Sequence, residues 1–277
     1  MRLINKDLMS NFLQKTSHLT DHTKTCYIGS LDLYSRFIGD NTPNMENVKA
    51  FMTDLEEAEY TVNSINRHIF AIKKFFSSNG LEWEDTIKAQ FVNLFDTDTP
   101  TISREDLGRV IIATKKHGNL VDMSYLALSS IYGLRRQELA EISNNRINKQ
   151  KSTIHIRSIK HGLERDHLIP DQIGFIKDYN FEEQKLPTIS LLFSKIALLA
   201  GYNRESGEGW HSIRRALVSG LFDNEISDAS IEFFMRWSPK NISRRYNTQG
   251  QNPSVADAKI FAKHPFLPFW ESKNAFI

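Results

Sequence analysis

The sequence has a single cysteine, Cys26, among its 277 residues. One thiol excludes an internal disulfide and a cysteine-based zinc site. The nine histidines include one HxxxH spacing, His18 to His22, and two such ligands alone do not make up a metal site. We therefore expect no structural metal.

Long apolar runs are also absent. No stretch approaches the ~18 consecutive apolar residues of a membrane span, and the beginning MRLINKDLMSNFLQK lacks the apolar block of a signal peptide. The chain is nevertheless 40% hydrophobic, which is enough for the core of one large or two ordinary domains. We expect a globular protein that stays in the cytoplasm and has no membrane partner.

The net charge of +2 is small, but it conceals an asymmetry. Residues 1–98 carry 10 Lys/Arg and 14 Asp/Glu, a net charge of −4, whereas residues 99–277 carry 25 and 19, a net charge of +6. A polyanion such as nucleic acid would be held chiefly by the second part, although a local basic face can operate on an acidic domain.

The first part of the chain is typical of helices alone. Thr20 and Gly39 are a suitable cap and stop for one helix, and the clearest helix ends at Gly80. Its apolar stripe consists of Val62, Ile65, Ile69, Ile72 and Phe76. The opposite face carries Asn63, Arg67 and Lys74. This face could follow a phosphate backbone or be simply solvated, and the charge pattern alone favours solvation.

A polar segment, FDTDTPTISRED, separates this helical part from the rest, and we place the joint at residues 96–102. Beyond it, the apolar period changes from helical to alternating around Ile154 and Ile156, and KHG turns the chain before RDHLIP. Helical patterns return at 188–200, at 211–222 and from 238 past 246. The fold class is therefore mainly α with a small β-sheet, with domains at 1–97 and 98–277.

Two arginine motifs stand on apolar segments of the second domain. In YGLRRQELAEI, Arg135 begins a buried helix and Glu138 follows one turn later, so a local ion pair is a sufficient explanation. In HSIRRALVSGLFD, a helix apolar around most of its circumference and hence buried, His211 and Arg214 project together. A buried guanidinium needs an anionic partner. That partner could be a phosphate or an internal carboxylate, and the motif alone favours the carboxylate.

The stretch RWSPKNISRRYNT places Trp237 nine residues before Tyr246. It has a purely local explanation, because Ser238 is a good helix cap and Pro239 suits the first helical position. Trp237 would then contact Ile242 as a hydrophobic staple.

The order of these motifs along the chain is more informative than any one of them. GLRxxEL at 133–139, a turn lysine at 160, HxxR at 211–214 and the tryptophan nine residues before a tyrosine follow one another along nearly the whole chain. Each motif is weak, but together they resemble the tyrosine recombinase (phage integrase) family. The resemblance implies a helical, SAM-like core-binding domain followed by a mixed α/β catalytic domain with a C-terminal tail, the two forming a C-shaped clamp on DNA.

The resemblance also implies roles for individual residues. The catalytic residues would be Arg135, Lys160, His211, Arg214, Trp237 and the nucleophile Tyr246, with Glu138 supporting them. DNA contacts would come from Asn63, Arg67, Lys74, Arg215, Arg244 and Arg245. The chain departs from the family where a common Gly-His pair reads Arg236–Trp237, where Arg215 stands in place of His or Lys, and where KHGLER lacks a glycine directly after the lysine.

The chemistry implied by the resemblance is the transfer of a DNA phosphodiester to the tyrosine, forming a 3′-phosphotyrosine bond, and then to another 5′-hydroxyl. Because the covalent intermediate keeps the bond energy, the reaction needs no ATP, metal or other cofactor. Two fixed guanidiniums would neutralise the charge that develops on the non-bridging oxygens. Lys160 would protonate the departing 5′-oxygen.

The expected partners are double-stranded recombination sites in the nucleoid, further copies of the chain in a tetramer, and accessory proteins. The apolar tail residues Phe266, Leu267, Phe269 and Trp270 would pack on their own domain or on a neighbouring subunit, with a slight preference for the neighbour. Two alternatives stay open, a type IB topoisomerase-like enzyme that nicks and reseals DNA, and a relative that binds DNA without catalysis.

Overall fold

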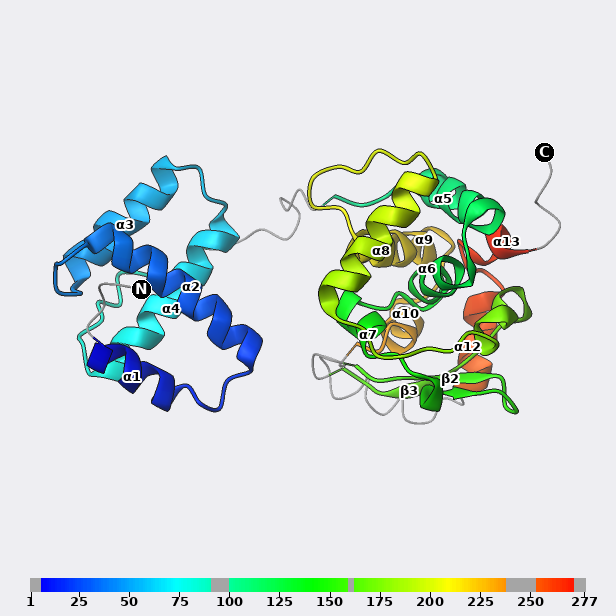
Figure 1. The fold of residues 1–277 in the computed structure, drawn as a ribbon, viewed down its shortest axis with the longest axis horizontal. Helices are drawn as coiled ribbons and strands as arrows, with labels where there is room; N and C mark the ends of the chain where they lie inside the picture. Colours follow the sequence, from blue (N-terminus) through cyan, green and yellow to red (C-terminus); the bar gives the residue numbers. More distant parts are fainter. Residues whose placement is uncertain (1–5, 91–99, 159–161, 238–252, 272–277) are drawn as a thin grey trace. The chain divides into compact units, whose positions relative to one another are not determined.

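The computed structural model describes residues 6–90, 100–158, 162–237 and 253–271 (Figure 1). The chain divides into two compact units, Met1–Asp98 and Thr99–Ile277, which we call the N-terminal and C-terminal units. Each unit buries its own hydrophobic cluster. Within the ranges just given, no helix has the length and apolar character needed to cross a membrane.

The N-terminal unit consists of helices α1 (Lys6–Lys15), α2 (Asp21–Ile38), α3 (Met45–Glu57) and α4 (Val62–Asn79). Their boundaries follow capping chemistry. The side chain of Thr20 accepts a hydrogen bond from the backbone N–H of Thr23 at the start of α2, and Gly39 follows its end, as the sequence predicted. Gly80 ends α4 with a φ of 67°, in the left-handed region that glycine adopts without a steric penalty.

Helix α4 has the two faces expected of it. Ile65, Ile69, Ile72 and Phe76 are buried among α1, α2 and α3. Val62, at the start of the predicted stripe, is exposed. On the opposite face Asn63 and Arg67 are exposed and Lys74 is half-buried.

The C-terminal unit surrounds one apolar helix. Every residue of α6 (Leu120–Tyr132) from Ser124 onward is buried, because α9 (Trp210–Asp223), α5 (Arg104–His117), α7 (Arg136–Ala140) and the 3₁₀ segment η2 (Asp171–Lys177) cover it. The other helices among the described residues of this unit are α8 (Leu186–Leu199), α10 (Asp228–Phe234), α12 (Pro253–Phe261), α13 (Leu267–Trp270) and the short η1 (Asn144–Arg146).

A three-stranded antiparallel sheet lies at one end of this unit (Figure 1). Its order is β1 (Ile147–Asn148), β2 (Thr153–Ile156) and β3 (Arg165–Leu168), with Ile154 opposite His167 and Ile156 opposite Arg165. The predicted hairpin is confirmed, and both isoleucines are buried. The sequence did not indicate β1, since a two-residue strand has no measurable alternation. Helix α12 packs against β3.

The C-terminal tail requires a correction. Phe266, Leu267 and Trp270 are buried within the core of their own unit, and Phe269 packs partly against it. The indole N–H of Trp270 donates a hydrogen bond to Oγ of Ser130 (3.1 Å). The preference for a neighbouring subunit therefore does not hold for these four residues, because α5 and η2 already provide an apolar surface in the same chain.

Replacing Trp270 with alanine should destabilise the C-terminal unit by about 3–5 kcal/mol, because it removes a large buried ring and leaves a cavity. Urea unfolding at two protein concentrations measures this loss, which should not depend on concentration. The matched control is Leu198→Ala, which alters a side chain that is 82% exposed. A loss that grows on dilution would mean that the tail packs between subunits.

Candidate active site

The first arginine motif lies where α6 ends and α7 begins. Gly133 ends α6 with a φ of 61°. A Cβ atom at this position would lie 2.6 Å from Cε of Met235, the far end of a flexible side chain, so the left-handed backbone is the stronger reason for glycine here. Leu134 is fully buried, and Arg135 then occupies the N-cap position of α7 with an extended backbone. The turn at Gly133 thus determines where the Arg135 side chain starts.

Glu138 holds Arg135 in place. The backbone N–H of Arg135 donates to Oε2 of Glu138 (2.8 Å), and its Nη1 donates to Oε1 (2.7 Å). The Glu138 carboxylate is buried, whereas the Arg135 side chain keeps 23% of its surface exposed. The local ion pair suggested by the sequence is therefore present, and it leaves part of the guanidinium accessible.

The second motif lies on the first two turns of α9. The indole N–H of Trp210 donates to the Ile189 carbonyl (2.7 Å) and anchors the start of the helix. Arg214, one turn later, is buried. Its Nη1 donates to the Gly133 carbonyl and its Nη2 to the Met235 carbonyl (3.1 Å). Arg214 thereby joins the end of α6 to the end of α10.

One expectation about α9 was wrong. The motif favoured an internal carboxylate as the partner of Arg214, yet no carboxylate in the described ranges lies within ion-pair distance of it. Two backbone carbonyls take that place, because they are the free acceptors at the ends of neighbouring helices. The expected burial of α9 is confirmed for eight of its residues, whereas His211, Ser219 and Phe222 are exposed along one side.

A third arginine lies behind the first two. Arg236 is fully buried, and its Nη2 lies 3.5 Å from Oε2 of Glu138. Burial, with added repulsion from Arg236 and Arg135, lowers the pKa of Arg214 to about 9 against the opposing charge of Glu138. Burial alone would raise the pKa of Glu138, but the surrounding cations and the Arg135 N–H hold it below its ordinary value. Three guanidiniums around one carboxylate leave an excess of positive charge that a bound anion would offset.

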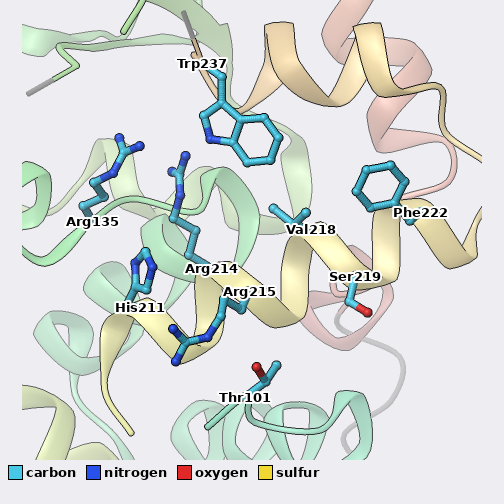
Figure 2. Close-up of a pocket in the computed structure, with 9 residues that line it drawn as sticks. All are labelled: Thr101, Arg135, His211, Arg214, Arg215, Val218, Ser219, Phe222 and Trp237. Atoms are coloured by element: carbon cyan, nitrogen blue, oxygen red, sulfur yellow. The ribbon is translucent and has the colours of Figure 1, made fainter. Parts of the chain in front are cut away.

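Arg135 and Arg214 border one pocket of about 570 Å³ (Figure 2). Figure 2 shows the Arg135 and Arg214 guanidiniums close to the Trp237 ring, with His211 below them at the start of α9. The complete lining is Thr101, Arg135, His211, Arg214, Arg215, Val218, Ser219, Phe222 and Trp237. The pocket therefore combines a cationic end with an apolar side formed by α9 and the tryptophan.

The structure brings together Arg135, His211, Arg214, Arg215 and Trp237 from the sequence-predicted set. Glu138 lies behind Arg135 and does not line the pocket. Lys160, Arg244, Arg245 and Tyr246, together with the cap and staple residues Ser238, Pro239 and Ile242, lie outside the described residues. In the part of the chain that the structure describes, no group of three or more His, Cys, Asp or Glu side chains could hold a metal.

Sequence reasoning missed two contributors to the site. Thr101 lines the pocket from the segment before α5, and nothing in its local sequence singles it out. Arg236 could have been found, because it replaces the glycine of a Gly-His pair directly before Trp237.

Comparisons with known proteins bear on the family and the fold. Residues 9–82 match the N-terminal SAM-like domain of phage integrases. The chain is 27% identical over 175 residues to tyrosine recombinase XerA of Pyrococcus horikoshii. The resemblance to the tyrosine recombinase family is confirmed. The XerA match covers 61% of this chain and 57% of XerA, less than two thirds of that relative's length.

Two solved structures have a similar fold. A lambda integrase (75–356) dimer bound to a COC′ core site matches with a TM-score of 0.65 and 14% identity, over 87% of this chain and all of that one. XerH recombinase bound to its palindromic difH substrate, in a post-cleavage complex, matches with a TM-score of 0.58 and 13% identity, over 87% and 80% of the two chains. The expected fold class, a SAM-like helical domain with a mainly helical recombinase domain, is thus confirmed.

Glu138→Gln should remove the charge that holds Arg135 and Arg236, and we expect it to lower the free energy of unfolding by about 3–5 kcal/mol at neutral pH. The pKa of Glu138 is lowered from 4.5 by folding, so its stabilisation is complete above that pH and is lost as the pH falls through the folded value. The wild type should therefore lose more stability in acid than the variant does.

Urea unfolding of both proteins at neutral and acidic pH measures this difference. Glu183→Gln is the matched control, because Glu183 is exposed. Parallel stability curves for wild type and Glu138→Gln would contradict the assigned pairing.

Proposed function

We propose that the chain is a site-specific tyrosine recombinase that cleaves and rejoins DNA through a covalent 3′-phosphotyrosine intermediate. The observation that carries the proposal is the convergence of Arg135, His211 with Arg214, and Trp237 on one cationic pocket. These residues come from three separate segments, and local packing of each segment gives no reason for them to meet.

The pocket suits a phosphodiester. A guanidinium presents a planar fork of donors that matches two oxygens of a phosphate. Arg135 is fixed by Glu138 and Arg214 by two carbonyls, so neither needs to reorganise when charge develops on the phosphorus. His211, which is exposed at the pocket rim, would donate a hydrogen bond to the same phosphate or assist proton transfer.

Tyr246 and Lys160 would carry the covalent and proton-transfer steps. The phenol oxygen of Tyr246 attacks the phosphorus, the bond from phosphorus to the 5′-oxygen breaks, and Lys160 donates a proton to that oxygen. The reverse sequence with another 5′-hydroxyl rejoins the strand and frees the tyrosine. A phenol has an intrinsic pKa of ~10, so the nearby cations would assist its ionisation.

Trp237 would contact the phosphate and pack beside it. An indole offers one N–H donor and cannot carry a proton in acid–base catalysis. Trp237 also packs against the core of its unit, so its ring is held beside the two guanidiniums.

DNA would be held by both units. The face of α4 with Asn63, Arg67 and Lys74 presents polar and positive groups to solvent, and Arg215, Arg244 and Arg245 would add contacts near the pocket. We propose double-stranded recombination sites as the substrate and a tetramer as the active assembly, by analogy with a lambda integrase tetramer bound to a Holliday junction, which has a similar fold. This step rests on analogy between folds. A topoisomerase-like enzyme would use the same pocket without exchanging strands.

The nucleophile can be tested on nicked duplexes recovered from a random DNA pool by binding to the protein. Wild type should form a covalent protein–DNA adduct, and Tyr246→Phe should form none because it lacks the attacking oxygen. Tyr60→Phe, which changes an exposed tyrosine of the N-terminal unit, is the matched control and should behave as wild type. Absence of an adduct from wild type on every recovered duplex would refute the proposal. An adduct without strand exchange would favour the topoisomerase-like alternative.

Trp237→Phe should reduce the rate of adduct formation by about tenfold or less, since it removes one hydrogen bond worth ~1 kcal/mol and keeps an aromatic ring. Single-turnover adduct formation on the same duplexes measures the rate. A loss as complete as that of Tyr246→Phe would show that the indole takes part in the chemistry itself.

A further inference from the structure

Arg236 occupies a backbone position that favours glycine. Its φ of 60° lies in the left-handed region that glycine prefers, and its side chain is the largest of those fully buried in the described part of the protein. A buried charge also has to give up its hydration. A glycine here would avoid both costs, so the presence of arginine calls for a compensating interaction.

The contacts of Arg236 supply that interaction. Its Nη2 donates to the Tyr132 carbonyl (3.2 Å) and lies 3.5 Å from Oε2 of Glu138. Its Nη1 lies 3.2 Å from Nε2 of His167 and donates to the Phe234 carbonyl (3.3 Å). Arg236 therefore connects the end of α6, the carboxylate that holds Arg135, and strand β3.

The backbone of Arg236 makes a further connection. Its carbonyl accepts a hydrogen bond from the N–H of Leu163 (3.1 Å), in the segment that joins β2 to β3. A Cβ atom on Gly162 would lie 2.3 Å from the same carbonyl, so the glycine is required for this approach. One residue thus ties the segment after residues 159–161 to the segment before Trp237.

The network continues to the far side of residues 238–252. Nδ1 of His167 lies 3.3 Å from Oδ1 of Asp257 in α12, and the same oxygen accepts a hydrogen bond from Nη2 of Arg165 (2.6 Å). Burial lowers the pKa of His167 to about 4, so the imidazole is neutral and adds no charge. Arg236 and Asp257, which precede and follow residues 238–252, are therefore both fixed to β3.

The charges of the cluster explain what Arg236 adds. Arg165 and Asp257 form a neutral pair. Among the described residues, Glu138 forms ion pairs with Arg135 and Arg236, and its charge also acts on Arg214. These four groups carry a net charge of +2, whereas a glycine at 236 would leave +1. A phosphodiester carries one negative charge, and its pentacoordinate transition state carries a second. The extra cation therefore stabilises the doubly charged transition state more than the singly charged phosphodiester.

We propose that Arg236 is a positioning residue that shares Glu138 with Arg135 and, as a third buried cation behind the pocket, makes the site selective for a doubly charged phosphoryl group. This inference rests on the proposed function, because it assigns the second charge to the transition state of phosphoryl transfer. Arg236 does not line the pocket. It acts through its contact with Glu138 and through the electrostatic field of its guanidinium.

The test uses two small anions, so it needs no DNA site. Sulfate carries two charges, and dimethyl phosphate is a minimal phosphodiester with one. Binding is followed through the indole N–H resonance of Trp237, assigned by its loss in Trp237→Phe. In Arg236→Met the dissociation constant for sulfate should rise about tenfold and that for dimethyl phosphate by about threefold or less, since the second charge doubles the Coulomb energy. Arg236→Lys should recover most of the loss.

Arg204→Met is the matched control, because it removes an exposed arginine of the same unit and should leave both constants unchanged. Equal losses for the two anions in Arg236→Met, or no loss for either, would overturn the inference. If Arg236→Met does not fold, the same two dissociation constants are compared in Arg236→Lys and Arg236→Gly. We expect Arg236→Lys to bind both anions nearly as wild type does, and Arg236→Gly to lose more affinity for sulfate than for dimethyl phosphate.

The result is separable from the proposed recombinase activity. If wild type forms no DNA adduct, the recombinase activity is rejected, while the different losses in sulfate and dimethyl phosphate binding can still be measured. An adduct that forms at the same rate in Arg236→Met and wild type rejects only the role of Arg236.

Discussion

The burial of three guanidiniums near the single carboxylate of Glu138 is the constraint on which the C-terminal unit depends. A buried cation is tolerated only when fixed acceptors replace its hydration. Arg135 uses the carboxylate, Arg214 uses the carbonyls of Gly133 and Met235, and Arg236 uses both kinds of acceptor. The ends of α6 and α10 must therefore lie where these carbonyls can be reached.

This constraint explains why glycines stand at the contact points. Gly133 adopts the left-handed backbone that ends α6, and Gly162 allows the carbonyl of Arg236 to approach the hairpin. A larger residue at position 162 would push the hairpin away from the segment that carries Arg236. The hydrophobic core around α6 is the rigid part of the unit. The hydrogen bonds of the arginines then fix the positions of the helix ends around this core.

The polar network also explains how a site assembled from distant segments can be rigid. Arg165, His167 and Asp257 join β3 to α12, while Arg236 joins β3 to Glu138. Buried hydrogen-bonded networks help to specify a single packing. The proposed phosphoryl transfer would benefit from such rigidity, because preorganised charges need not move as the reaction proceeds.

Much of the fold could be read from the sequence because it rests on local rules. Thr20, Gly39 and Gly80 delimit helices through capping, and the alternation at Ile154 and Ile156 identifies the hairpin. The motifs around Arg135, Arg214 and Trp237 likewise identified residues that border one pocket. The two-residue strand β1 was not predictable, because it carries no local signal and forms only by pairing with β2.

What the tertiary structure decided concerns partners that are distant in the sequence. Carbonyls bind Arg214, the tail packs on its own unit, and Arg236 joins Glu138 to β3. The sequence determined which charged side chains would lie on apolar segments and hence would need partners when buried. Which acceptor each one found depended on the positions of helix ends brought together by folding, and periodicity along a single segment carries no information about those positions.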